Sequence, residues 1–198
     1  MKKSVIIIIA VVAVIAVIGY TIGPKFYNTG IRLQETATAQ WGNVESSYQR
    51  RADLIPNIVN TAKGYAEFEQ ETLTKVIEAR SKATAITIDP SNITPAQMAQ
   101  FQQAQSGLSS ALSKLLVTFE RYPDLKANEN FKELINELER TENRINVERN
   151  RFNEAVRPHN QHLKVFPNNI VNNFIGKFEE MEYFKAKEGT EDAPVVEF

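Results

Sequence analysis

Apolar side chains recur at helical spacing through the main part of the chain. Steps of three, four and seven residues place them on one face of an amphipathic helix. The first such run comprises Trp41, Val44, Tyr48, Ile55, Ile58, Ala62, Tyr65, Val76, Ala79 and Ala83. It predicts a first helical arm from about Asn28 to about Ala85. Because proline removes a helical hydrogen bond and crowds the preceding turn, the arm is expected either as one kinked helix or as two helices broken near Pro56 or Gly64.

The same pattern predicts a second helix after a turn at 86–92. Thr94 and Pro95 have the composition of an N-cap followed by the first helical residue. The pattern that follows them is regular, and it stops at Tyr122-Pro123 because the residue before a proline disfavours the helical conformation.

A third helix and a last amphipathic segment follow. The helix is expected to end at Arg157-Pro158, and the segment begins after Pro167. The apolar positions are Phe131, Ile135, Leu138, Ile145, Phe152 and Val156 in the helix, and Ile170, Phe174, Phe178 and Met181 in the segment. No strand-like alternation competes with these runs, so the chain is predicted to be all-α, an antiparallel helical bundle of the four-helix type with long helices.

The chain begins with an uninterrupted apolar block. No charged residue occurs between Lys3 and Lys25, and Val5 to Ile22 reads VIIIIAVVAVIAVIGYTI. Eighteen helical residues span roughly 27 Å, about the thickness of a hydrocarbon core. No small-residue cleavage site follows a polar stretch, and a lipobox needs cysteine, which the chain lacks. The sequence therefore predicts one uncleaved transmembrane helix over Val5–Ile22.

This block sets the predicted domain organisation and location. Residues 1–24 form a membrane anchor, residues 25–185 the helical bundle, and residues 186–198 a flexible polar tail. Lys2 and Lys3 favour a cytoplasmic N-terminus, and hence a bundle outside the cytoplasm. Lys25 and Arg32 on the other side weaken that bias, so the orientation in the cell membrane stays open.

Composition excludes several functional classes. The net charge of −1 provides no field for nucleic acid. The absence of cysteine excludes disulfides, thiolate metal sites and cysteine nucleophiles. His159 and His162 are expected as exposed or capping residues at a helix end, and Glu139-x-x-Glu142 lacks the histidine of a carboxylate di-metal motif. The sequence therefore predicts no catalytic, cofactor or metal site and no enzymatic activity.

Four charged residues lie on or beside the apolar stripes: Arg51, Glu69, Glu142 and Arg149. Burying one such charge alone would cost several kcal/mol, so they are expected to pair, arginine with glutamate. They could form an ion network that fixes helix register, a polar cavity that binds an anion or a carboxylate, or a surface that faces a partner.

The last third of the chain is rich in asparagine: Asn150, Asn153, Asn160, Asn168, Asn169, Asn172 and Asn173. Caps and turns account for several of them. The others could form hydrogen bonds between helices or a binding face, and the sequence alone does not choose.

Several motifs in order along the chain resemble the LemA family of bacterial membrane proteins. They are Tyr27-Asn28, Trp41-Gly42-Asn43-Val44, the run from Arg50 to Val59, Lys63-Gly64-Tyr65, Glu69, Ala79-Arg80, the run from Glu120 to Lys126, the run from Glu139 to Ile145, Arg149, Phe152-Asn153, Asn160 and Phe166-Pro167. The resemblance extends from the anchor to about Gly176. It implies a single N-terminal membrane helix, a soluble bundle of long antiparallel helices, and no agreed enzymatic activity. It also implies a short N-terminus outside the cell, opposite to the charge bias, and Phe152 stands where the family often has tyrosine.

Two functional hypotheses follow. The first is a non-enzymatic, membrane-anchored scaffold that binds another protein or assembles into homo-oligomers, with uncovered Phe26, Ile31 and Leu33 in the membrane-proximal arm as contacts. Its partners would be the lipid bilayer and protein, with no nucleic acid or small-molecule ligand. The alternative is a ligand-binding module or enzyme that uses Arg51, Glu142 and Arg149.

Overall fold

The computed structural model describes residues 3–65, 69–90 and 92–185. Every regular element in these residues is helical, which confirms the all-α prediction. The elements are α1 (Lys3–Lys63), α2 (Gln70–Thr84), α3 (Pro95–Phe119), α4 (Pro123–Ala127), α5 (Glu129–Lys164), α6 (Asn168–Val171) and a π-helical turn, η1 (Asn172–Gly176). The predicted tail at 186–198 lies outside the described residues.

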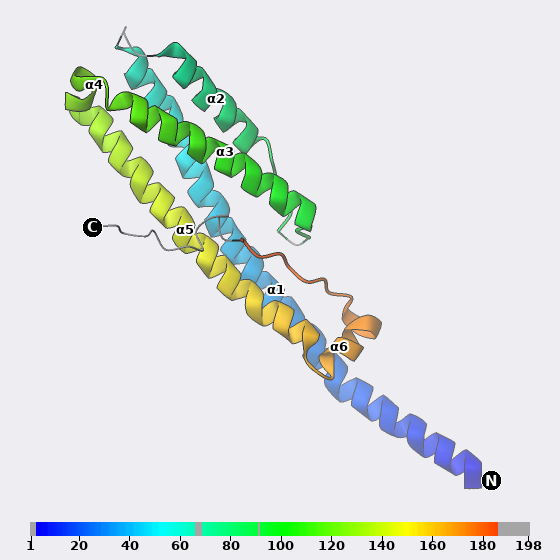
Figure 1. The fold of residues 1–198 in the computed structure, drawn as a ribbon. Helices are drawn as coiled ribbons and strands as arrows, with labels where there is room; N and C mark the ends of the chain where they lie inside the picture. Colours follow the sequence, from blue (N-terminus) through cyan, green and yellow to red (C-terminus); the bar gives the residue numbers. More distant parts are fainter. Residues whose placement is uncertain (1–2, 66–68, 91, 186–198) are drawn as a thin grey trace, which may run out of the picture.

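Two long helices, α1 and α5, run side by side and form the axis of the molecule (Figure 1). The α2–α3 hairpin packs at the end remote from the N-terminus, where a core draws on all four helices. Toward the other end the chain after η1 returns along α1 and α5, and α1 continues alone beyond α6. Four-helix packing is therefore confined to one end of the rod.

The first arm is two helices, and the break lies at Gly64. Helix α1 continues through Pro56, where buried Ile55, Ile58 and Val59 hold both flanks of the proline in the core. Directly after Lys63 the backbone makes short turn bonds, from Gly64 N to Thr61 O (3.2 Å) and from Tyr65 N to Ala62 O (3.1 Å). Packing of the residues around Pro56 therefore keeps the helix continuous there, and the break falls at Gly64.

The start of α3 is as predicted. Thr94 Oγ1 accepts a hydrogen bond from Gln97 N at 3.3 Å, and Gln97 Oε1 accepts one from Thr94 N at 3.1 Å. This reciprocal pair is a capping box, with Pro95 at the first helical position.

The expected end of the third long helix at Arg157-Pro158 is wrong. Helix α5 continues through Pro158 to Lys164. An internal proline costs about 3 kcal/mol, but His159, Asn160 and Leu163 beyond it are buried, and their packing outweighs that cost. The extension also covers Phe26, which was expected to be uncovered: its ring is buried and stacks on His162 at 4.8 Å.

The last amphipathic segment also departs from the prediction. Helical structure ends with η1 at Gly176, and residues 177–185 form no helix. We call these nine residues the strap. Met181 and Phe184 of the strap are buried in a second core with Trp41, whose ring stacks on Phe184 at 5.6 Å. Met98 and Phe101 of α3 also belong to this core, so the strap packs there with α1, α3 and α5.

Beyond α6, the N-terminal part of α1 leaves its apolar side chains exposed, from Val5 to Tyr20 among those described. On length and apolarity together, none of the helices in the described residues qualifies as a membrane span. The transmembrane helix over Val5–Ile22 stays a prediction.

Candidate functional site

Arg51 is a buried cation on α1 whose side chain bonds to α3 and α5. Its side chain is 1% exposed. From α1, its Nη1 donates to Glu142 Oε2 on α5 (2.7 Å) and to Ser109 Oγ on α3 (2.8 Å). Its Nη2 donates to Gln105 Oε1 on α3 at 2.6 Å. We call Arg51, Gln105, Ser109 and Glu142 the Arg51 cluster.

The Arg51 cluster also reaches α2 and an aromatic ring. Gln105 Nε2 donates to Ala83 O at 3.2 Å, so the cluster connects all four helices. The guanidinium lies 5.1 Å from the centre of the Tyr48 ring, within range of a cation–π interaction. Burial raises the pKa of the Tyr48 hydroxyl, and the Arg149 and Arg51 cations oppose this only in part. The Tyr48 phenol therefore stays neutral near pH 7 and contacts the Arg51 cation through its ring.

The other two predicted charges lie elsewhere. Glu69 accepts a hydrogen bond from Arg121 Nη2 at 2.8 Å, at the remote end of the bundle. Arg149 lies over the Phe184 ring at 4.9 Å and donates to Lys185 O at 2.9 Å. The structure therefore brings Arg51 and Glu142 together and gives Glu69 and Arg149 separate partners.

Three asparagines hold the backbone of the strap. Each donates from its amide nitrogen to a carbonyl and accepts from the N–H of the same residue: Asn172 with Phe178 (both 2.9 Å), Asn160 with Met181 (2.8 and 2.9 Å), and Asn153 with Phe184 (2.9 and 2.8 Å). We call Asn153, Asn160 and Asn172 the asparagine clamp.

The distance between two clamp asparagines along α5 matches the distance between their partners along the extended strap. Asn153 and Asn160 are seven residues apart on α5, an axial rise of roughly 10.5 Å. Their partners, Phe184 and Met181, are three residues apart, which in an extended chain is roughly 10 Å. The strap therefore runs antiparallel to α5 in register with one face of that helix. Because the clamp contacts only backbone groups, it recognises an extended chain and not its side chains.

The two histidines line the same end of α5. His159 is buried, and its Nε2 lies 3.0 Å from Glu179 O in the strap. Burial lowers the pKa of His159, since the imidazolium would be desolvated. His162 Nε2 lies 3.0 Å from Phe26 O. The expectation of exposed or capping histidines is therefore wrong, because α5 does not end at Pro158.

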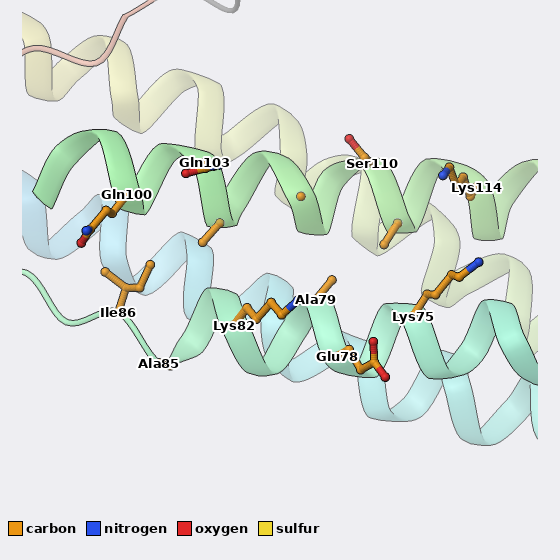
Figure 2. A pocket seen from close by; sticks show the side chains of 13 residues that line it. Lys75, Glu78, Ala79, Lys82, Ala85, Ile86, Gln100, Gln103, Ser110 and Lys114 are labelled. Atoms are coloured by element: carbon orange, nitrogen blue, oxygen red, sulfur yellow. The ribbon is translucent and has the colours of Figure 1, made fainter. Parts of the chain in front are cut away.

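An open groove of about 690 Å³ lies between α2 and α3 (Figure 2). Small residues such as Ala79, Ala104, Gly107 and Ala111 line it. Lys75, Lys82, Lys114 and Glu78 also line it, and Figure 2 shows them along α2 and α3. Lys75 pairs with Glu71 at 2.5 Å, whereas within the described ranges Lys82 and Lys114 make no ion pair. The lining of the groove thus combines small side chains with three lysines and one glutamate, Glu78.

The geometry of these sites offers no catalytic constellation. In the part of the chain that the structure describes, no group of three histidine, aspartate or glutamate side chains could hold a metal ion. Arg51 and Glu142 line neither the α2–α3 groove nor a second one around Asn57 and Glu137. What the sites can do is hold helices in register and hold an extended segment.

Comparison with known proteins places the chain in a family. The sequence model of the LemA family matches residues 40–198. The chain belongs to the LemA family. Arg51 and Glu142 of the Arg51 cluster, and Asn153 and Asn160 of the asparagine clamp, are among the residues through which this chain resembles the LemA family.

Two kinds of relative are similar to this LemA-family chain. Magnetosome protein MamQ 2 of Paramagnetospirillum magneticum is 24% identical over 189 residues, which are 86% of this chain and 68% of the relative. Magnetosome protein MamQ of Magnetospirillum gryphiswaldense is 24% identical over 187 residues, with the same coverage. Protein LemA of Metamycoplasma hominis is 27% identical over 128 residues, 65% of this chain and 55% of the relative. None of these names specifies an enzymatic activity.

The sequence showed that the last third of the chain is rich in asparagine, but it did not predict that three of these residues bind the strap. The usable signal was the seven-residue spacing of Asn153 and Asn160 next to buried Phe152 and Val156, which marks amides on a core-facing stripe. Their partner could not be found in this way, because the asparagines bind backbone groups of the strap, and backbone groups leave no mark in the sequence.

Proposed function

We propose that this LemA-family protein is a non-enzymatic scaffold, anchored to a membrane by the N-terminal part of α1, whose bundle docks a protein partner. The main observation in support of this proposal is the stretch of α1 that extends beyond the other helices with its apolar side chains exposed. Exposed apolar surface of this extent is typical of a site that contacts lipid or protein. A bilayer covers such a stretch on all sides at once, which a single partner helix does not.

We expect the full-length protein to stay in the membrane pellet after alkaline carbonate washing, because only buried apolar surface holds it there. A matched variant with Ile8→Lys and Val12→Lys should move largely into the supernatant. Both side chains are exposed, so the bundle should still fold. Quantitative blotting of pellet and supernatant measures the partition. Release of the unmodified protein by alkali would contradict the anchor.

The charges within the bundle support a scaffold over a ligand-binding module. A cavity for an anion would present arginine donors to solvent, but Arg51 is buried, and its Nη1 and Nη2 donate to Glu142, Ser109 and Gln105. Arg149 donates to the strap and lies over Phe184. Both cations therefore act within the fold.

The groove between α2 and α3 is the docking face in this proposal. The alanines and the glycine that line the groove would let a partner helix approach closely. Lys82 and Lys114, which form no ion pair within the described residues, favour acidic residues on that helix. The occupant is thus an amphipathic helix of another protein with carboxylates beside its apolar face.

Site-specific cross-linking tests the groove, because the chain has no cysteine. We expect Gly107→Cys, labelled with a photoreactive maleimide in native membranes, to capture one protein. Gly42→Cys on α1 is the matched control, since both glycines are helical with open space around an added Cβ. Lys82→Glu with Lys114→Glu should reduce capture at position 107 about tenfold, as two lost charge pairs would.

Two outcomes would contradict this docking face. Equal adducts at positions 107 and 42 would mean non-specific labelling. An adduct with a second copy of this chain would replace the partner by self-assembly.

A further inference from the structure

Four apolar side chains near the end of the bundle face solvent. Phe166 and Phe174 are each 80% exposed, and Ile170 and Ile175 are about half exposed. All four occur within ten residues, in the connection after α5, in α6 and in η1. We call them the interfacial patch. A segment of a water-surrounded domain would normally turn such residues inward.

Two asparagines of the same segment make hydrogen bonds to other parts of the backbone. Asn168 Nδ2 donates to His162 O at 3.0 Å, and Asn172 bonds both backbone groups of Phe178. Asn168 and Asn172 therefore face the bundle and the rings of Phe166 and Phe174 face outward, with Asn169 and Asn173 exposed beside them. This orientation is the reverse of what contact with water favours.

The interfacial patch lies beside α1 where that helix leaves the bundle (Figure 1). Ile175 Cδ1 is so close to Gly23 that an added Cβ there would lie 3.0 Å from it. From Gly23 back to Val5 is eighteen residues, an axial rise of roughly 27 Å, about the thickness of a hydrocarbon core. If Val5 lies near one edge of the bilayer, Gly23 and Ile175 lie near the other.

We infer that the interfacial patch is a second membrane contact, which inserts into the boundary between headgroups and acyl chains of the bilayer that holds α1. This inference rests on the anchor proposed above. Lipid is the occupant because the patch is continuous, through Gly23, with the exposed apolar part of α1. Its aromatic and aliphatic side chains suit the shallow depth that monotopic segments occupy. With α1 it fixes the bundle at two points and so limits its tilt on the membrane.

Single cysteines with a fluorescent label test this depth on the full chain in phosphatidylcholine–phosphatidylglycerol vesicles that contain spin-labelled lipid quenchers. The probes are Phe174→Cys in the patch, Val12→Cys in α1, and Val117→Cys, which is 70% exposed near the end of α3 remote from the N-terminus. All three replace exposed apolar side chains, so the fold should not change. We expect a shallow quencher to reduce the emission at position 174 about threefold more than at position 117, and a deep quencher to act most strongly at position 12.

The outcomes separate the inference from the anchor. Quenching at position 12 with position 174 no different from position 117 would overturn the second contact and leave the anchor. No quenching at position 12 would overturn the anchor and, with it, the inference. A label at 174 that is shielded from water but not quenched by lipid would show a protein contact and would also overturn the inference.

Discussion

Replacing Arg51 by alanine is expected to lower the free energy of unfolding by about 3–5 kcal/mol. The substitution removes a cation that is buried and bonded to Glu142, Gln105 and Ser109. It also leaves a cavity where the aliphatic stem packed. Gln105 keeps its bond to Ala83 but loses its strongest partner, so a buried polar group becomes poorly satisfied.

The neighbouring Arg50 provides a matched control. Its side chain is 60% exposed and pairs with Glu137 at 2.5 Å, so Arg50→Ala should change the free energy of unfolding by less than about 1 kcal/mol. Urea unfolding of the full chain in detergent, monitored by circular dichroism, measures the free energy of unfolding of both variants. Equal midpoints for the two variants would show that the Arg51 cluster is hydrated and does not hold the helices together.

Helical spacing was enough to predict the fold class and most of the helices. The N-cap at Thr94 and the amphipathic helices were visible in local signals, because caps and amphipathic faces act within a few residues. The helix end expected at Pro158 was wrong, since α5 passes through that proline, whereas at Pro56 the pattern allowed a continuous or a broken helix and α1 is continuous. In both cases buried residues on either side compensate for the lost bond, and burial is a property of the assembled core.

The candidate site was predictable only in part. The pattern placed Arg51 and Glu142 on core-facing stripes, and the structure brings them together. It could not exclude Glu69 and Arg149, because periodicity gives the face of a helix but not the axial level at which two helices meet. Arg149 is seven residues from Glu142, roughly 10 Å farther along α5, where the strap and not α3 is its neighbour.

The segment after Pro167 was expected to be one helix because Ile170, Phe174, Phe178 and Met181 satisfy helical spacing. Ile170 and Phe174 do lie in α6 and η1, but Phe178 and Met181 lie in the strap. Two facts outweigh that pattern. Phe178 fits against α1 only because Gly30 and Gly176 have no Cβ, which would lie within 3 Å of its ring. The asparagine clamp then supplies backbone hydrogen bonds at Phe178, Met181 and Phe184, which partly replace those of a helix.

Replacing Asn160 by aspartate is expected to lower the free energy of unfolding by about 2–4 kcal/mol and to release the strap locally. Asn160 is buried and makes both bonds to Met181. The carboxylate has nearly the same shape but has no donor for Met181 O, and it would place a buried negative charge against that carbonyl. Hydrogen exchange should show the amides of Met181 and Phe184 losing protection while those of the α2–α3 hairpin keep it.

Asn150→Asp is the control for the charge. Asn150 is exposed on the same helix, so its substitution should change the free energy of unfolding by less than about 0.5 kcal/mol and leave strap exchange unchanged. If Asn160→Asp also left the strap amides protected, the stacking of Phe184 on Trp41 would be sufficient to hold residues 177–185. The clamp would then follow from the position of the strap and would not determine it. Loss of protection in Asn160→Asp alone would mean that the paired amide bonds determine where the strap binds.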